Sequence, residues 1–216
     1  MKYNLIQHIT TSCNYDCSYC DVIKDWKNIK DLDLELLKNF IKLNKDNINR
    51  FKFFWWEPLL RWNDIKNIID NTKIYLWNKF EIVTNTTLLN DEIWLYFYNY
   101  FEIIFFSIDS ENQFNYEKIF NFINKHNLKN KVYFNLIISP SKEEIAYEQF
   151  LKIYSAWYKN FNILPVYFTK KWSKDNLLNL SKVLKKIIDL SIVDSSINLY
   201  WFQSNNWYNS SLINDS

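Results

Sequence analysis

The chain has 216 residues, 48% of them hydrophobic, and its 26 basic and 24 acidic residues give a net charge of +2. This length suits one sizeable core, and the near balance of charges argues against a general role in binding nucleic acid or a membrane surface. The apolar runs are shorter than the roughly 18 residues that a membrane span needs, and the N-terminal stretch MKYNLIQHITTSC lacks the long apolar segment of a signal peptide. We therefore expect a cytoplasmic protein that binds neither nucleic acid nor membranes.

Apolar, β-prone runs alternate with helical patterns along the chain. The expected elements are, in chain order, strand Tyr3–Ile9, helix Leu32–Leu43, strand Arg50–Phe54, helix Asn63–Asp70, strand Phe80–Thr84, helix Asp91–Tyr100, strand Glu102–Ile108, helix Gln113–His126, strand Lys131–Ile138, helix Lys142–Tyr158, strand Asn160–Val166, helix Lys174–Leu190 and a further strand at Ile197–Phe202. Ser173 is the expected N-cap of the last helix, and Asp91 and Glu92 suit the first turn of the third.

Six β-then-α units in succession predict an α/β fold with parallel strands joined by right-handed crossovers. The strands are expected to be apolar on both faces, as in a sheet that is covered on both sides. An open doubly wound sheet and a complete or partial barrel both fit this order. No linker rich in Pro or Ser interrupts it, so we expect one domain over residues 3–202, with residues 203–216 as a polar tail or the start of a truncated C-terminal region.

Reactive and polar residues follow the expected strands. In both architectures ligands bind at the carboxyl ends of the strands. The segments after the first four strands are TTSCNYDCSYC, WWEPLLR, TNTTLL and SIDS. The fifth strand carries Asn135 within its apolar run, and the sixth contains Leu164-Pro165-Val166. The sequence therefore predicts a ligand site at this edge of the sheet.

The three cysteines of the chain, Cys13, Cys17 and Cys20, all lie within the stretch CNYDCSYC. Their odd number and the expected reducing compartment argue against a disulfide framework, so clustered thiolates in a loop indicate a metal. Zinc would need a fourth ligand, which no residue with the usual spacing supplies, although His8 could turn in. Three thiolates on an iron–sulfur cubane would leave one iron open to an exogenous ligand, which is a catalytic arrangement.

The spacing Cys13-x3-Cys17-x2-Cys20 after a first strand resembles the signature of the radical S-adenosylmethionine (radical SAM) enzymes. The stretch FFWWEPLL resembles the Gly-Gly-Glu-Pro motif of that family with both glycines replaced by tryptophan. IVTNTTLL is similar to its third-strand motif, FSIDS to its fourth, and Ile163–Val166 to part of its sixth strand. The resemblance covers roughly residues 3–190 and implies a (β/α)6 partial TIM barrel with parallel strands, which agrees with the count of six units.

The resemblance implies a 4Fe–4S cluster with one iron on each of Cys13, Cys17 and Cys20, and S-adenosylmethionine (AdoMet) chelating the fourth iron. Tyr19 and the backbone near residues 164–166 would lie beside the adenine, residues 55–58 beside the methionine amino group, and three polar side chains beside the ribose and carboxylate. The implied cofactor-binding residues are Tyr19, Trp55, Trp56, Glu57, Pro58, Thr84, Asn85, Ser107, Asp109, Asn135, Leu164, Pro165 and Val166.

The reaction that the resemblance implies is reductive cleavage of AdoMet to methionine and a 5′-deoxyadenosyl radical, which abstracts hydrogen from a substrate. A peptide or protein substrate and an electron donor such as flavodoxin or ferredoxin are the implied partners. The alternative for the whole chain is a non-catalytic partial barrel that binds zinc or a degenerate cluster, with the indoles of Trp55 and Trp56 filling the methionine subsite. Single motifs also have structural alternatives, namely Glu57 as a cap, Thr84-Asn85 as a turn, and Ser107 with Asp109 as the N-terminal cap of the next helix.

Glycine is absent from the chain, whereas tryptophan occurs ten times. A protein of this length has on average about fifteen glycines, at roughly 7% usage. Some bacteria read the codon UGA as glycine, and translating such a gene with UGA as tryptophan would place Trp at Gly positions, Trp55 and Trp56 first among them. Removal of glycine by design is the alternative. Further tryptophans in turn-like contexts are Trp26, Trp77, Trp157, Trp201 and Trp207, whereas the contexts of Trp62 and Trp172 suit an aromatic residue.

Overall fold

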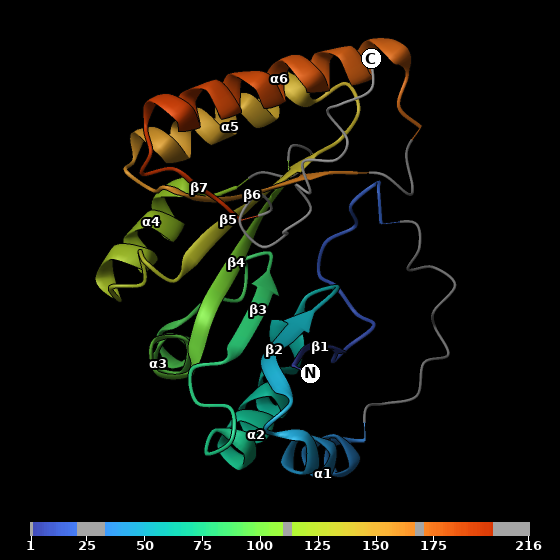
Figure 1. Cartoon of the computed structure of the whole chain (residues 1–216), viewed down its shortest axis with the longest axis vertical. Coiled ribbons are helices and arrows are strands. Elements are labelled where there is room, and N and C mark those ends of the chain that lie inside the picture. The colour runs from blue at the N-terminus through green and yellow to red at the C-terminus, as the bar shows by residue number, and fades with distance from the viewer. Residues whose placement is uncertain (1, 21–32, 110–113, 167–170, 201–216) are drawn as a thin grey trace.

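The computed structural model describes residues 2–20, 33–109, 114–166 and 171–200 (Figure 1). The strands are β1 (Tyr3–His8), β2 (Ile48–Phe54), β3 (Phe80–Thr84), β4 (Phe101–Asp109), β5 (Val132–Ile138), β6 (Asn160–Pro165) and β7 (Asn198–Leu199). The helices are α1 (Leu34–Asn44), α2 (Trp62–Thr72), α3 (Asp91–Tyr100), α4 (Tyr116–Lys125), α5 (Glu143–Ser155) and α6 (Lys174–Val193), with a short 3₁₀ helix, η2 (Pro58–Arg61), before α2.

The strands form one seven-stranded parallel sheet in the order β1-β2-β3-β4-β5-β6-β7. Each strand pairs with the next one along the chain, so β1 and β7 lie at opposite ends of the sheet. The sheet curves without closing, and the helices cover its outer side (Figure 1). The expected α/β partial barrel with parallel strands is confirmed. Among the described helices, none is both long and apolar enough to cross a lipid bilayer.

Polar caps fix where several helices begin. Ser173 Oγ accepts the backbone N–H of Asn176 at 3.1 Å, and Asn176 Oδ1 accepts the N–H of Ser173 at 3.3 Å, which closes a capping box at the start of α6. The expected N-cap is therefore confirmed. Asn90, which the sequence pattern did not single out, caps α3 by accepting the N–H groups of Glu92 and Ile93.

Some boundaries differ from the expected ones for local reasons. The helix expected over Lys142–Tyr158 ends at Ser155, because the backbone turns into the left-handed region at Trp157. The helix expected from Gln113 begins at Tyr116, because Asn115 Oδ1 accepts the N–H of Lys118 at 2.9 Å and caps it there. Of the last expected strand, Ile197–Phe202, the described part contains the two-residue β7, and residues 201–202 lie outside the described residues. The tail at residues 203–216 lies outside the described residues.

The outer face of the sheet carries the hydrophobic core. Alternate strand residues pack there against the inward-facing stripes of the helices, and burying a side chain as large as Leu or Phe contributes about 1.5–3 kcal/mol. The fully buried members include Phe51, Phe53, Phe106, Phe134, Ile65, Ile123 and Phe150. This single apolar layer holds the helices to the sheet.

The inner face of the sheet is mixed. Charged and amide side chains lie there beside buried apolar ones such as Ile103 and Phe105, so the expectation of strands that are apolar on both faces holds only in part. Arg50 and Lys52 of β2 form ion pairs with the buried Glu81 of β3, at 3.1 and 2.9 Å. Asn135 of β5 and Asn162 of β6 are buried on the same side. The helices cover the outer face alone, so the inner face lines the interior of the barrel and carries its polar groups.

Replacing Glu81 by Ala tests the charge cluster on the inner face. The carboxylate side chain is 3% exposed, so its loss takes from Lys52 the carboxylate that it pairs with and leaves Arg50 paired with Glu102 alone. We expect the free energy of unfolding to fall by about 2–4 kcal/mol in denaturant titrations. Asp189→Ala is the control, because Asp189 pairs with Lys185 on the surface with side chains 56% and 74% exposed, and its loss costs less than about 0.5 kcal/mol. Equal effects of the two substitutions would contradict this role of Glu81.

Candidate functional site

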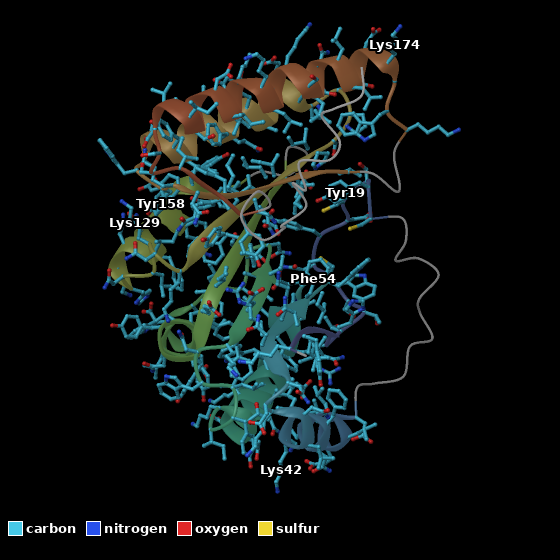
Figure 2. All side chains as sticks on the ribbon, viewed as in Figure 1. Tyr19, Lys42, Phe54, Lys129, Tyr158 and Lys174 are labelled. Carbon is cyan, nitrogen blue, oxygen red and sulfur yellow. The ribbon has the colours of Figure 1, made fainter. Side chains whose placement is uncertain are left out.

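A cavity of about 250 Å³ opens at the carboxyl ends of strands β2 to β6. Tyr19 of the loop after β1 and Phe54 of β2 both lie on this inner side, whereas Lys42 and Lys129 project from the outer surface (Figure 2). Predicted site residues that line the cavity are Cys13, Cys17, Cys20, Tyr19, Trp55, Trp56, Asn85, Ser107, Asp109, Asn135 and Leu164. The structure therefore brings together segments that are far apart in the sequence.

Five residues that sequence reasoning missed complete the described lining. They are Tyr15, Phe54, Val83, Phe114 and Ile137. Val83 and Ile137 lie two residues from Asn85 and Asn135, so the alternation of side chains along a strand could have found them. Nothing in the sequence pattern marks Tyr15 or Phe114, because both lie in loops whose course only the fold decides.

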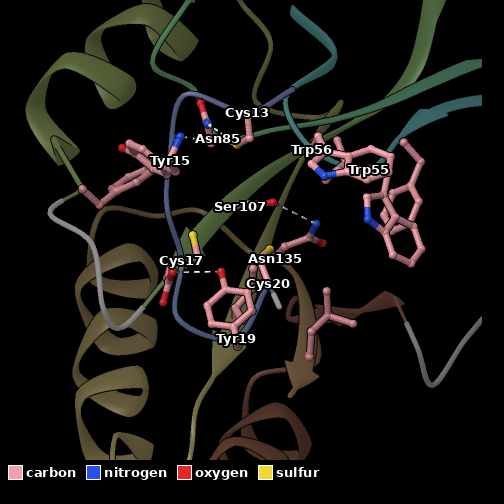
Figure 3. A pocket seen from close by; sticks show the side chains of 16 residues that line it. Cys13, Tyr15, Cys17, Tyr19, Cys20, Trp55, Trp56, Asn85, Ser107 and Asn135 are labelled. Carbon is pink, nitrogen blue, oxygen red and sulfur yellow. Dashed lines mark hydrogen bonds between the residues drawn. The ribbon is translucent and has the colours of Figure 1, made fainter. Parts of the chain in front are cut away.

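The three cysteines lie in the loop after β1, are half-buried and form no disulfide. The backbone N–H of Tyr15 donates to Cys13 Sγ at 3.4 Å, and Asn85 Nδ2 donates to the same sulfur at 3.9 Å. The Cys20 thiol donates a hydrogen bond to the Cys17 sulfur. This hydrogen bond raises the pKa of Cys20 and lowers the pKa of Cys17. Figure 3 shows the three sulfurs on one side of the cavity.

This donor set fits an iron–sulfur cluster. Thiolate sulfur is the ligand that such clusters use, the three thiols face one cavity, and N–H donors already point at Cys13. Among the described residues, no three His, Cys, Asp or Glu side chains are yet close enough together to hold a metal ion. The loop thus places all three cysteine thiols at one cavity, although their sulfur atoms are not yet at the spacing of metal ligands.

The Trp55-Trp56 pair follows β2 directly and lines the same cavity as the cysteine loop (Figure 3). Both residues have left-handed backbone, with φ of 78° and 48°. Their rings pack on His8, with centroid separations of 5.0 Å for Trp55 and 5.9 Å for Trp56. Burial lowers the pKa of His8, which favours a neutral imidazole in this aromatic contact. His8 therefore packs against the indoles.

Glu57 is fully buried and does not line the cavity. Its carboxylate accepts three hydrogen bonds, from the backbone N–H of Leu59 at 3.0 Å, the hydroxyl of Thr84 at 2.8 Å and the backbone N–H of Asn85 at 2.6 Å. The backbone N–H of Glu57 donates to the carbonyl of Ser12 at 3.3 Å. Burial raises the pKa of the carboxyl, and the three donors oppose that rise. Glu57 thus joins the ends of β2 and β3 to the cysteine loop.

Ser107, Asn135 and Asn162 form a polar row across β4, β5 and β6. Asn162 Nδ2 donates to Asn135 Oδ1 at 2.9 Å, and Asn135 Nδ2 lies 3.5 Å from Ser107 Oγ. The three residues are direct neighbours in the strand register. Asn162 was missed from the sequence, although it lies two residues before Leu164 and therefore on the same face of β6.

Tyr19 and Asp109 connect the cysteine loop to β4. The Tyr19 hydroxyl donates to Asp109 Oδ2 at 2.8 Å, and Gln149 Nε2 donates to the Asp109 carbonyl at 3.2 Å. Burial, and then the negative charge of Asp109, raises the pKa of Tyr19. Tyr19 therefore stays a neutral donor and holds the loop against the end of β4.

The remaining predicted residues lie beside the cavity and do not line it. Thr84 is buried with its hydroxyl on Glu57, and Pro58 begins η2. Val166 donates its N–H to the carbonyl of Ile138 at 3.0 Å, and its own carbonyl accepts the indole N–H of Trp172. The backbone groups of Val166 are thus engaged by the protein. The residues in this group are Glu57, Pro58, Thr84, Pro165 and Val166.

Comparison with known proteins identifies the family. The model of the radical SAM superfamily matches residues 8–132, which is more than half of the chain. The chain belongs to the radical SAM superfamily.

Two curated proteins are similar in sequence. An uncharacterized protein of Methanocaldococcus jannaschii, MJ0907, is 40% identical over 98 residues, which cover 43% of this chain and 33% of that protein. The radical SAM cyclopropyl synthase TigE of Paramaledivibacter caminithermalis is 25% identical over 214 residues, which cover 84% of this chain and 44% of that protein. The chain therefore spans less than half the length of these relatives.

The fold is similar to that of a solved radical SAM structure. Native anSMEcpe with bound AdoMet and Cp18Cys peptide superimposes with a TM-score of 0.72 at 14% sequence identity, over 92% of this chain and 63% of that chain. At this level of identity the likeness shows the shared fold, a partial barrel of parallel strands.

Replacing Glu57 by Gln tests the buried clamp, by which we mean the Glu57 carboxylate and the three donors that it accepts from. All three partners of the carboxylate are donors, so the amide nitrogen of Gln would face a donor and one hydrogen bond would be lost. We expect the free energy of unfolding to fall by about 1–3 kcal/mol, and further for Glu57→Ala. Glu92→Gln is the matched control, because Glu92 pairs with Lys66 and is 60% exposed. A Glu57→Gln protein as stable as the unsubstituted chain in denaturant titrations would refute the clamp.

Proposed function

We propose that the protein is a radical SAM enzyme that holds a 4Fe–4S cluster on Cys13, Cys17 and Cys20 and cleaves AdoMet reductively in the adjoining cavity. The observation that carries this proposal is the convergence of the three thiols and the carboxyl ends of β2 to β6 on one cavity. A cluster held by these cysteines would, when reduced, supply the electron for cleavage of AdoMet to methionine and a 5′-deoxyadenosyl radical, which would take a hydrogen atom from the substrate. The protein supplies binding, orientation and exclusion of water.

The cavity offers a separate set of contacts for each part of AdoMet. The backbone of Trp55 and Trp56 meets the methionine amino group, and Ser107, Asp109 and Asn135 meet the ribose and carboxylate. Tyr19 and the segment Leu164–Val166 lie toward the adenine. Two observations support this division: the polar row is fixed by strand register, and Tyr19 is held in place by Asp109. Thr84, Asn85, Glu57 and Pro58 act by shaping the loops around these contacts.

A peptide or protein is the substrate class that we propose. One fact supports it: anSMEcpe, a structural relative, is known with a bound peptide. We further propose one domain over residues 3–202, a cytoplasmic location, and flavodoxin or ferredoxin as the electron donor. The net charge of +2 supports a partner set without nucleic acid or membrane.

A second candidate function is a non-catalytic partial barrel that binds zinc or a degenerate cluster. The observation that favours it is the position of the Trp55 and Trp56 indoles, which line the cavity beside the cysteine loop. Bulky rings there reduce the space for a ligand. The two candidates differ in the metal that the thiols hold and in whether AdoMet is cleaved.

Anaerobic reconstitution with iron and sulfide tests the cluster. We expect a brown protein whose absorbance bleaches with dithionite, and near-complete loss of bound iron in Cys13→Ala, Cys17→Ala and Cys20→Ala, because a cubane held by two thiolates is labile. Ser18→Ala is the matched control, because it changes the same loop and keeps all three thiols. A colourless protein with one zinc would support the non-catalytic candidate, and a single Cys→Ala variant with full iron content would refute the ligand assignment.

The double substitution Trp55→Gly/Trp56→Gly tests the AdoMet site. Removing two indoles from the cavity lining frees space beside the thiols, so we expect the Kd for AdoMet to fall at least about tenfold, a change that corresponds to about 1.4 kcal/mol. With dithionite, the reconstituted variant should release 5′-deoxyadenosine, measured by mass spectrometry. Trp77→Gly is the control, because the Trp77 side chain is 63% exposed and does not line the cavity. A reconstituted double variant that neither binds nor cleaves AdoMet would refute the proposed activity.

A further inference from the structure

Three tryptophans adopt left-handed backbone, a conformation that suits glycine. Trp55, Trp56 and Trp157 have φ of 78°, 48° and 66°. Positive φ is uncommon for any residue with a Cβ and is an outlier for bulky ones, because Cβ approaches the following carbonyl oxygen. The other described residues with positive φ are Asn78, Thr86, Asn127 and Ser141. Asn tolerates this region, whereas positive φ is an outlier for the β-branched Thr86 and for the bulky tryptophans. Three of the described residues in this region are tryptophans, two of them adjacent, and they are the ones considered below.

Trp157 occupies the glycine position of a Schellman motif at the end of α5. The N–H of Tyr158 donates to the carbonyl of Ile153 at 3.3 Å, and the N–H of Trp157 donates to the carbonyl of Tyr154 at 2.9 Å. These two bonds define the motif, and the residue between them at the C′ position is usually glycine. The apolar contact of the motif is also present, since Tyr158 and Ile153 are both buried. The Trp157 side chain is 72% exposed, so little packing offsets its backbone strain.

The end of α4 has the same motif, with an asparagine at the C′ position. The N–H of Leu128 donates to the carbonyl of Ile123 at 3.0 Å, and the N–H of Asn127 donates to the carbonyl of Asn124 at 3.3 Å. Asn127, with φ of 53°, occupies the C′ position, where Asn is the common substitute for Gly. The chain therefore uses Asn at one helix end and Trp at the equivalent position of the next helix.

Trp55 and Trp56 place two left-handed residues in succession in the loop after β2. The backbone is held on both sides, because Phe54 pairs with His8 in the sheet and the Glu57 N–H donates to the carbonyl of Ser12 at 3.3 Å. The loop therefore has little freedom to relieve the strain. The indoles extend from this loop along the cavity wall (Figure 3), where a residue without a side chain would leave the cavity open.

Other tryptophans fill roles that need an aromatic side chain. Trp94 lies within α3 and stacks on His126, with ring centroids 4.8 Å apart and planes at 8°. Trp172 donates its indole N–H to the carbonyl of Val166. Neither is among the residues with positive φ. The described tryptophans thus include some on glycine-like backbone and some whose indole makes a specific contact.

We infer that positions 55, 56 and 157 are glycines in the protein made by its native host, encoded by UGA, while Trp94 and Trp172 are genuine tryptophans encoded by UGG. The ten tryptophans of the chain, three of them on left-handed backbone, are what such a reading of UGA produces. This inference rests on backbone geometry and composition and is independent of the proposed reaction. Backbone conformation and side-chain contacts also separate the glycine-like positions from the genuine tryptophans, which the composition alone cannot do.

Mass spectrometry of the protein from its native host tests the inference directly. Cleavage after Lys52 and Arg61 yields the peptide FFWWEPLLR. We expect it to be lighter by two indolylmethyl substituents than the same peptide from a recombinant protein that carries both tryptophans. The peptide that contains position 157 should be lighter by one, and the peptides that contain Trp94 and Trp172 should be unchanged. An intact indole at 55, 56 or 157, or UGG codons there, would overturn the inference.

A stability measurement supplies a readout on the recombinant chain. Trp157→Gly should raise the Tm by about 2–4 °C, because it removes left-handed strain from an exposed side chain. Trp94→Gly should lower the Tm, because glycine weakens a helix interior and the stacking on His126 is lost. This pair controls for a general effect of replacing Trp by Gly. A fall in Tm for Trp157→Gly would contradict the assignment of position 157.

Discussion

The site depends on one buried carboxylate. Glu57 joins the end of β2 to the end of β3 through Thr84 and Asn85, and its backbone reaches the cysteine loop through Ser12. A carboxylate without water is stable only when donors surround it, so the loop ends cannot move apart without leaving it unpaired. Residues 55 and 56, Asn85 and the cysteines are thereby held around one cavity. Glu57 acts here as a positioning residue that never touches the cavity itself.

The two faces of the sheet differ in their contacts, because the outer face packs against the helices and the inner face carries the charged and amide groups. The outer face is built from Phe and Ile and holds the helices, so it can supply nearly all of the hydrophobic stabilisation. The inner face is then free to carry groups that a folding core would reject, such as Glu81 between Arg50 and Lys52. Such groups cost desolvation energy, which the outer layer offsets.

Much of this arrangement could be predicted from the sequence, and the failures have physical causes. The alternation of strands and helices, the parallel order and the cysteine loop follow from patterns that repeat or cluster locally. The ion pairs of the inner face were missed, because the sequence does not show that Arg50, Lys52 and Glu81 meet across neighbouring strands. The positions of Tyr15 and Phe114 depend on how loops meet across the barrel. The role of Glu57 as a buried clamp depends on contacts with residues 27 and 28 positions away along the chain, which no local pattern encodes.

The alignment of the polar row of Ser107, Asn135 and Asn162 depends on the register of three strands. These residues are paired across β4, β5 and β6, and their neighbours Phe106, Phe134 and Phe161 are paired in the same way on the opposite face. A slip of one residue in any of the three strands would turn a phenylalanine inward and an amide or hydroxyl into the core. The packing of these phenylalanines therefore holds the three strands in the register that keeps Ser107, Asn135 and Asn162 in line. A single substitution within the row would change its polar groups without shifting the strands.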